Sequence, residues 1–232
     1  MPRSLCLSDS WHTKYINSST PIISHINANY EKGAPRIAKG IPAGGIIVKV
    51  NGYNLESNRT APLIYVEVNG MKYTGTCEVN NKYSMKCKSP RVPLEKLDFS
   101  KSENEESSPL ELDFGFIMDD YKSVMDLNKR KYNPFPKFFM FKNPELFKFS
   151  EPGHIKHINP NDYITIDGKN VDLAATKNDV TVKVGSGTCK MMSMSHNKIA
   201  CIPPDAKSGD IRDVVVTVGD ALNFTIGRLI YD

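Results

Sequence analysis

The sequence has little that points to a membrane span or to catalysis. No apolar run approaches the about 20 residues of a membrane-crossing helix, and residues 1–7 are followed at once by polar residues, unlike a signal peptide. Gly-x-Ser-x-Gly, phosphate-binding-loop and His-Glu-x-x-His motifs are all missing. Adjacent carboxylates such as Asp119 and Asp120 are interpreted as solvated surface charge. We therefore expect a non-enzymatic segment that makes no membrane contact of its own.

The sequence also lacks a large excess of positive or negative charge. Thirty Lys and Arg residues against 26 Asp and Glu residues give a net charge of only +4, and the basic residues are scattered. Nucleic-acid-binding domains concentrate basic residues on one face or along one element. The densest basic cluster is Lys129-Arg130-Lys131, which is interpreted as a solvated turn. We expect no nucleic-acid partner, although an intracellular DNA-binding module remains an alternative.

What the sequence does contain is a repeated cysteine pattern. Gly-Thr-Cys, a second cysteine about a dozen residues later and a following proline occur at residues 75–90 and again at 187–204. The first cysteines are 112 residues apart and the second cysteines 114, which indicates two copies of one fold with small loop insertions. The four cysteines are Cys77, Cys87, Cys189 and Cys201.

Apolar residues alternate with polar ones in short runs throughout both copies. Examples lie at residues 65–68 and 180–184, next to the cysteine pairs, and at 46–50 and 214–218. Alternation with period two is the signature of a strand with one buried and one solvated face. Short strands with frequent Gly, Pro and Asn turns predict an all-β fold of two tandem immunoglobulin-like β-sandwiches.

The repeat also predicts where the domains begin and end. Residues 1–20 are polar and irregular, and are predicted to be the tail of a preceding module of a longer protein. The first domain is predicted at residues 21–142. It contains a loop at 98–111 that is acidic and rich in serine and therefore cannot pack as a core. The second domain is predicted at 143–232.

Phenylalanines gather near the predicted joint between the two domains. Phe139, Phe141 and Phe147 flank residues 141–145. Aromatic side chains bury large areas and dominate the energetics of interfaces. We expect these three rings to form a hydrophobic interface that limits bending.

The paired cysteines are interpreted as two local disulfides. Two strands joined by a short loop can bring their Cβ atoms within bridging distance, and each closed loop would stabilise its domain by roughly 3 kcal/mol. Disulfides require an oxidising compartment, so the export signal would lie elsewhere in a longer protein. Cys6 is left over, and its partner stays open.

A metal site is the main alternative use of these cysteines. Structural zinc needs close Cys or His doublets, and the one candidate doublet, His154 and His157, lies far from either pair in sequence. Residues 191–194 (Met-Met-Ser-Met) could ligate copper, but are interpreted as packing residues on the hairpin between Cys189 and Cys201. We expect no metal and no cofactor.

Three Asn-x-Ser/Thr sequences are candidate N-glycosylation sites. They begin at Asn17, Asn58 and Asn223. Asn17 and Asn58 lie in apparent loops, which favours their use, whereas Asn223 lies close to a predicted strand.

In their order, these features resemble the IPT/TIG domain, and more closely the plexin ectodomain. The resemblance runs from residue 21 to the end, and its most specific part is Phe-Gly-Phe-Ile-Met-Asp at residues 114–119. Departures occur at Ile46, where plexins usually have threonine after Gly-Gly, and at Asn161, where they usually have glycine after proline. The other matching stretches are Cys77 to Pro90, residues 141–144, 167–170 and 229–232.

The resemblance implies two consecutive plexin IPT/TIG domains, the third and fourth. They would form a non-catalytic stalk in the extracellular part of a single-pass plasma-membrane receptor that works in axon guidance and cell signalling. The partners implied are neighbouring domains of the same receptor chain and, through a sema domain absent from this sequence, a semaphorin. The TIG repeats of a growth-factor receptor tyrosine kinase are an alternative that residues 114–119 disfavour.

Overall fold

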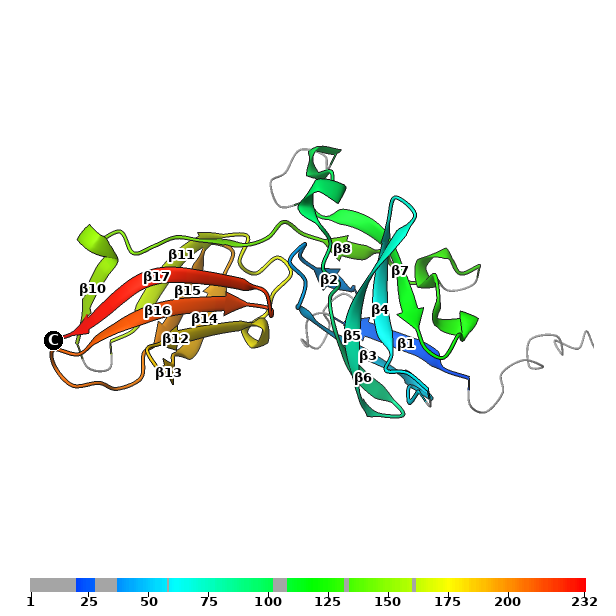
Figure 1. Ribbon diagram of the computed structural model, residues 1–232, viewed down its shortest axis with the longest axis horizontal. Helices are drawn as coiled ribbons and strands as arrows, with labels where there is room; N and C mark the ends of the chain where they lie inside the picture. The colour runs from blue at the N-terminus through cyan, green and yellow to red at the C-terminus, as the bar shows by residue number, and fades with distance from the viewer. Residues whose placement is uncertain (1–19, 28–36, 58, 102–107, 132–133, 160–161) are drawn as a thin grey trace, which may run out of the picture.

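The computed structural model describes residues 20–27, 37–57, 59–101, 108–131, 134–159 and 162–232. These residues form β-sheets joined by turns and short 3₁₀ helices, with one group of strands in each half of the chain (Figure 1). The all-β, sandwich-type class predicted from the sequence is confirmed. Asn17, Asn58 and Cys6 lie outside the described residues.

The first half forms one eight-stranded sheet in the order β1-β3-β6-β5-β4-β7-β8-β2. The long strand β5 pairs with β4 through residues 71–76 and with β6 through residues 77–81, so it carries the sheet from one layer into the other. The strands are β1 (Ile22–Asn27), β2 (Lys39–Gly40), β3 (Ile47–Tyr53), β4 (Leu63–Val68), β5 (Met71–Asn81), β6 (Ser84–Lys88), β7 (Leu110–Ile117) and β8 (Phe138–Met140). The 3₁₀ helices are η1 (Leu94–Lys96), η2 (Phe99–Lys101), η3 (Lys122–Val124) and η4 (Leu127–Lys129).

The second half forms a five-stranded sheet, β10-β17-β16-β12-β13, and a four-stranded sheet, β14-β15-β11-β9. The strands are β9 (Glu145–Leu146), β10 (Ile155–Ile158), β11 (Ile164–Lys169), β12 (Val180–Val184), β13 (Gly187–Thr188), β14 (Lys190–Ser195), β15 (Lys198–Ile202), β16 (Ile211–Val218) and β17 (Leu222–Tyr231). The 3₁₀ helices are η5 (Pro152–His154) and η6 (Lys177–Asp179). In β12 the side chains alternate strictly between buried and exposed, as the sequence pattern predicts.

The repeated Gly-Thr-Cys pattern has a steric reason. A Cβ added at Gly75 would lie 1.9 Å from the Lys88 carbonyl oxygen and 3.1 Å from the Pro90 nitrogen. A Cβ added at Gly187 would lie 2.6 Å from Cγ of Pro204. In both halves the segment that follows the second cysteine therefore crosses directly over this glycine, and no larger residue fits.

A second repeated feature lies at the turn between the two cysteine strands. Equivalent backbone hydrogen bonds occur in both halves: their donor residues are 116 positions apart in the sequence and their acceptor residues 114. Asn54 and Asn170, which lie beside these donors, both adopt positive φ, at 54° and 57°. The backbone hydrogen bonds are Gly52 N to Tyr83 O and Leu55 N to Lys82 O in the first half, and Gly168 N to Asn197 O and Val171 N to His196 O in the second. The two halves thus share one local architecture in atomic detail.

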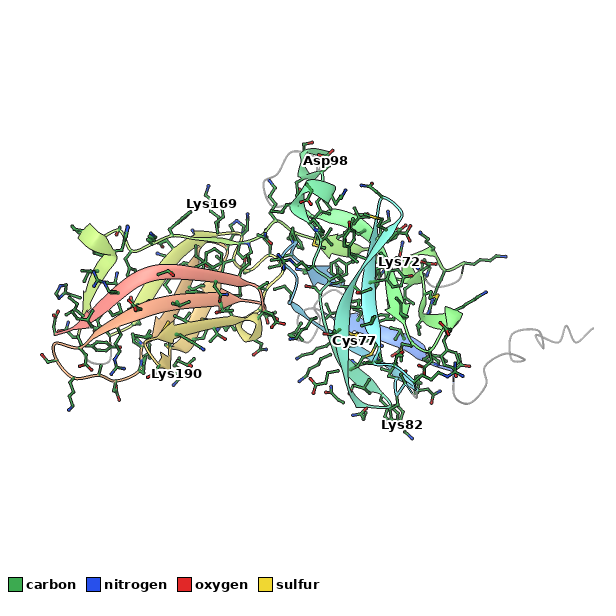
Figure 2. All side chains as sticks on the ribbon, in the orientation of Figure 1. Lys72, Cys77, Lys82, Asp98, Lys169 and Lys190 are labelled. Atoms are coloured by element: carbon green, nitrogen blue, oxygen red, sulfur yellow. A yellow bond between two sulfur atoms is a disulfide. The ribbon has the colours of Figure 1, made fainter. Side chains whose placement is uncertain are left out.

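Tyr65 anchors the insertion between β7 and β8 to the first half. Its ring is fully buried, and its hydroxyl donates to Asp126 Oδ1 at 2.7 Å and accepts from the Asp126 N–H at 2.9 Å. Lys72, labelled in Figure 2, covers the ring with its Nζ 4.2 Å from the centroid. Burial disfavours the phenolate and raises the pKa of Tyr65 to about 12, although the bond from the Asp126 N–H opposes this shift.

Gly75→Ala should destabilise the first half by about 1–3 kcal/mol, because the added methyl group has to displace the backbone of Lys88. Thr76→Ala, at the neighbouring exposed position of β5, is the control and should change the free energy of unfolding by less than about 0.5 kcal/mol. Chemical denaturation of the two variants measures the difference. Equal stabilities would mean that the close approach at Gly75 is not required.

The raised pKa of Tyr65 predicts a loss of stability in alkali. Below pH 10 the Tyr65 phenol is neutral in both the folded and the unfolded state, so its full contribution to the free energy of unfolding is present. Above pH 10 the phenol of the unfolded chain ionises first, and this contribution is lost as the pH rises toward about 12. The free energy of unfolding of Tyr65→Phe should therefore fall less steeply over this range than that of the unmodified protein. Tyr163→Phe, at an exposed tyrosine, should retain the original slope.

Candidate functional site

The structure contains both disulfides expected from the cysteine repeat. Cys77 on β5 and Cys87 on β6 are joined, as are Cys189, just before β14, and Cys201 on β15. All four residues are buried. Each bond therefore ties together neighbouring strands inside a core, where it supports the fold and offers no exposed reactive thiol.

The two halves share an apolar cluster where they meet. The core of the second half includes Ile41, Ile46 and Phe141 from the first, with exposed fractions of 2%, 0% and 8%. Ala43 and Phe139 are partly buried against the same cluster. These residues, together with the hydrogen bonds and close contacts described next, are called the junction.

The expected role of Phe147 at this joint is wrong. Its side chain is 43% exposed and is not among the residues of the shared cluster, whereas Phe139 and Phe141 are. Sequence reasoning missed Ile41 and Ile46, because they lie about 100 residues before the joint and carry no local sign of an interface.

Asp179 is the one charged side chain that is buried within the described part of the chain. Its Oδ2 accepts hydrogen bonds from Thr176 N (2.8 Å) and Thr176 Oγ1 (2.7 Å), which cap the short helix η6. Its Oδ1 accepts a hydrogen bond from the Ile47 N–H at 2.9 Å, the first amide of β3 in the other half. A single carboxylate therefore satisfies backbone donors on both sides of the junction, as a buried charge requires.

Backbone meets backbone beside this carboxylate. A Cβ added at Gly45 would lie 2.5 Å from Asp220 N, and one added at Gly219 would lie 2.8 Å from the Gly44 carbonyl oxygen. All three glycines have positive φ, from 60° to 82°. The Gly-Gly pair at 44–45 is thus where the turn between β16 and β17 packs against the first half, and side chains there would push the halves apart.

Polar contacts close the rest of the junction. Ala43 N donates to Asn143 Oδ1 at 3.1 Å, and Lys39 Nζ donates to the Leu173 carbonyl at 3.1 Å while lying 5.3 Å from the centre of the Phe141 ring. Partial burial lowers the pKa of Lys39, and the nearby Asp172 carboxylate opposes this shift. These two hydrogen bonds join segments that are 134 and 100 residues apart in the sequence.

An ion pair at the rim of the junction contributes much less. Lys88 Nζ lies 2.5 Å from Asp220 Oδ2, but both side chains are about half exposed. Such surface pairs are worth about 0–1 kcal/mol. The apolar cluster and the buried carboxylate therefore carry the stability of the junction.

The two histidines considered as metal ligands point to different partners. His154 Nδ1 lies 2.7 Å from the Phe149 carbonyl and His157 Nδ1 lies 2.8 Å from Asp232. Met191 and Met194 pack against the core of the second half, in line with the structural interpretation. Within the described ranges, no three His, Cys, Asp or Glu side chains converge as metal ligands.

The basic cluster at 129–131 is engaged within the protein. Lys129 Nζ lies 2.8 Å from Asp113 Oδ2, and its hydrogen bond lowers the pKa of that carboxylate. Arg130 donates to the Ser123 carbonyl, and its partial burial lowers the guanidinium pKa. Two of the three cations of this cluster are thus engaged with groups of the chain itself.

The remaining predicted site residue is Asn223, on β17. It is exposed, and its Oδ1 accepts a hydrogen bond from Thr217 Oγ1 at 2.8 Å. Its use as a glycosylation site stays a prediction. None of the helices in the described part of the chain is long and apolar enough to cross a membrane.

Comparisons with known proteins agree with this architecture. The family model described as IPT/TIG domain matches residues 154–231. The chain is 27% identical over 220 residues to Plexin A3 of Danio rerio, covering 94% of this chain and 10% of that protein. It is 28% identical over 168 residues to Plexin-A4 of Danio rerio (70% and 8% covered) and 26% identical over 180 residues to Plexin-B3 of Mus musculus (73% and 8%).

Among solved structures, the chain is similar to the Plexin A4 full extracellular region. The TM-score is 0.48 at 22% sequence identity, covering 88% of this chain and 14% of that one. The chain spans about a tenth of the length of the curated relatives it matches. The assignment of the two halves to the third and fourth IPT/TIG domains of a plexin stays a prediction. The chain is similar in sequence to a segment of several plexins, and its residues 154–231 match the IPT/TIG domain.

Proposed function

We propose that this chain is a non-catalytic stalk segment in the extracellular part of a plexin-like semaphorin receptor. Its role is to space and orient the ligand-binding head of the parent receptor. The observation that carries this proposal is the junction, where Ile41, Ile46 and Phe141 of one half lie inside the core of the other. Linked domains usually move relative to each other unless a hydrophobic interface holds them, so a shared core favours a stiff spacer.

We also propose the domain division 21–142 and 143–232, with residues 1–20 as the tail of a preceding module. The sheet topology supports this division, because β1–β8 pair only among themselves and β9–β17 likewise. In this proposal the shared core makes the two domains act as one unit. Their partners are then neighbouring domains of the same receptor chain, and a semaphorin binds the parent protein elsewhere.

The cysteines support the extracellular location. Paired, buried disulfides are rare in the reducing cytosol and common in secreted and cell-surface domains. The DNA-binding alternative would need free basic side chains, and Lys129 and Arg130 are already engaged within the protein.

Peptide mapping without reduction tests the location. Protein secreted from a eukaryotic cell should yield linked Cys77–Cys87 and Cys189–Cys201 peptides, with sugar on Asn17, Asn58 or Asn223. Free thiols together with bare asparagines in secreted protein would remove the physical basis for an extracellular stalk.

Asp179→Asn tests the stiffness of the junction. The amide group offers donors where the carboxylate accepted, so one of its backbone partners loses its hydrogen bond, at a cost of about 1–3 kcal/mol. Small-angle X-ray scattering should then show a broader distribution of interdomain distances.

Two control variants separate the interdomain effect from others. Asp220→Asn removes the exposed ion pair with Lys88 and should leave the scattering profile unchanged. Thr176→Val removes the hydrogen bond from the Thr176 hydroxyl to Asp179 but keeps the one from Ile47 N. It should therefore affect the stability of η6 more than the distances between the two domains. If the profile of Asp179→Asn equals that of the unmodified protein, the carboxylate does not hold the joint.

A further inference from the structure

The two disulfides occupy equivalent motifs but different positions in their strand pairs. Cys77 lies directly opposite Cys87 in the pairing of β5 with β6. In the second half, the residue opposite Cys201 is Met191, and Cys189 precedes β14, so that bridge runs diagonally. The Cα atoms of the first pair are 3.9 Å apart and those of the second pair 5.7 Å.

The first bridge spans a non-hydrogen-bonded position of the sheet. The Cys77 N–H donates to the Pro62 carbonyl at 3.0 Å, on the side of β4, and therefore points away from Cys87. At such positions of an antiparallel pair the two backbones come closest, to about 4.5 Å between Cα atoms. Disulfides usually join Cα atoms about 4.4–6.8 Å apart, and a bridge outside that range is easier to reduce. The second bridge lies within the range, whereas the first does not.

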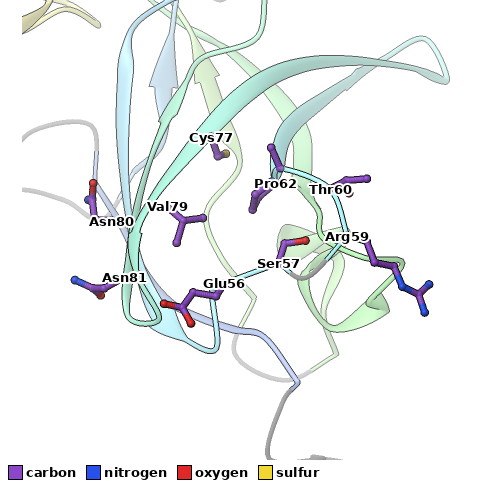
Figure 3. A pocket seen from close by; sticks show the side chains of 10 residues that line it. Glu56, Ser57, Arg59, Thr60, Pro62, Cys77, Val79, Asn80 and Asn81 are labelled. Atoms are coloured by element: carbon purple, nitrogen blue, oxygen red, sulfur yellow. The ribbon is translucent and has the colours of Figure 1, made fainter.

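A hollow in the first half reaches one end of this bridge. Its volume is about 450 Å³, and Cys77 contributes to its lining together with Pro62 and Val79 (Figure 3). Cys77 is 7% exposed, whereas Cys87 is fully buried. Thiol–disulfide exchange depends on which sulfur the attacking thiolate can reach. The sulfur open to attack is therefore that of Cys77, and Cys87 is the leaving group.

The chain that follows Cys87 supports the junction. Ser89, two residues later, is buried; its N–H donates to the Ile46 carbonyl at 2.8 Å, and its Oγ accepts from the Ile46 N–H at 3.0 Å. The Ser89 carbonyl also accepts from Gly45 N at 3.0 Å. Ile46 lies in the cluster shared by the two halves, and Gly45 packs against Asp220. The bridge thus anchors the segment that holds the first half's side of the junction.

We propose that the Cys77–Cys87 bridge is a site of thiol–disulfide exchange whose opening loosens the junction. The co-reactant is a dithiol or a pair of small thiols. A thiolate attacks Cys77 Sγ and forms a mixed disulfide, the Cys77–Cys87 bond breaks, and the Cys87 sulfur leaves as a thiolate that takes up a proton. A second thiolate attacks the sulfur of the first, so that Cys77 leaves and is protonated in turn. The protein gains two electrons and two protons, and the two thiols are oxidised to a disulfide.

The consequence at the junction follows from what the open bridge no longer holds. Ser89 keeps its hydrogen bonds to Ile46 and Gly45, but β6 is no longer tied to β5 two residues earlier. The backing of the junction then depends on hydrogen bonds alone, and the two halves move more freely. All of these contacts lie within the chain, so the inference does not depend on the proposed receptor role.

Graded reduction of the intact folded chain tests the exchange site. Dithiothreitol is added, iodoacetamide traps the thiols that form, and peptide mapping follows each cysteine. Cys77 and Cys87 should be alkylated several-fold faster than Cys189 and Cys201, which are the internal control. Val79→Phe, which fills the hollow, should slow the opening of the first bridge only. Equal rates for the two bridges, or a first bridge unaffected by Val79→Phe in a variant with an unchanged circular dichroism spectrum, would overturn the proposed site.

Small-angle X-ray scattering tests the coupling to the junction. The intact chain with only the first bridge reduced and alkylated should show a broader distribution of interdomain distances than the oxidised chain. The double variant Cys77→Ala with Cys87→Ala should reproduce this change without reductant, and Cys189→Ala with Cys201→Ala is the matched control that should keep the original distribution. An unchanged distribution after selective opening, or the same broadening in both double variants, would show that the first bridge does not control the junction.

Discussion

Burial of one carboxylate between two backbones is the constraint on which the arrangement of this protein depends. Asp179 can remain inside the junction only while Ile47 of the other half and Thr176 of its own half donate to it. If the halves separated, Ile47 N–H would have to find water and Ile46 would lose its buried environment. The hydrogen bond fixes the orientation of the halves. The apolar cluster supplies most of the favourable free energy, because burying several large apolar side chains stabilises more than one hydrogen bond does.

Close approach of two chain segments also explains the repeated Gly-Thr-Cys motif. Gly75 and Gly187 are required because the chain after the second cysteine passes over them, and the disulfide beside each one holds that crossing in place. The glycine, the two cysteines and the proline of the repeated motif therefore all belong to one structural feature, the crossing of one strand over another. The motif appears twice because the crossing is where β5 moves between layers in the first half and where β13 leads into β14 in the second.

Local patterns in the sequence predicted the β class, because alternation and turn residues act over a few positions. They also predicted that Phe141 lies at the joint, because Phe141 stands in the sequence between the two predicted domains, and the structure places it in the shared cluster. They were wrong about Phe147 and did not find Ile41, Ile46 or Asp179, since a contact across about 130 residues leaves no periodic trace. In the sequence, a buried aspartate cannot be told from an exposed one, because the groups that donate hydrogen bonds to it lie elsewhere in the chain. Hydrogen bonds such as that from Ile47 therefore needed the three-dimensional structure.

The two halves differ in the chemistry of the segment that follows the positive-φ asparagine, Asn54 in the first half and Asn170 in the second. In the second half the segment after Asn170 supplies Val171, Ala174 and Ala175, which are buried in the cluster that also contains Ile41, Ile46 and Phe141. In the first half the matching segment begins with Leu55, which is buried like Val171, and continues with the polar residues Glu56, Ser57 and Arg59. Large exposed apolar patches are an aggregation hazard, so polar side chains suit the segment that stays exposed to water, and apolar ones suit the segment that lies in a shared core.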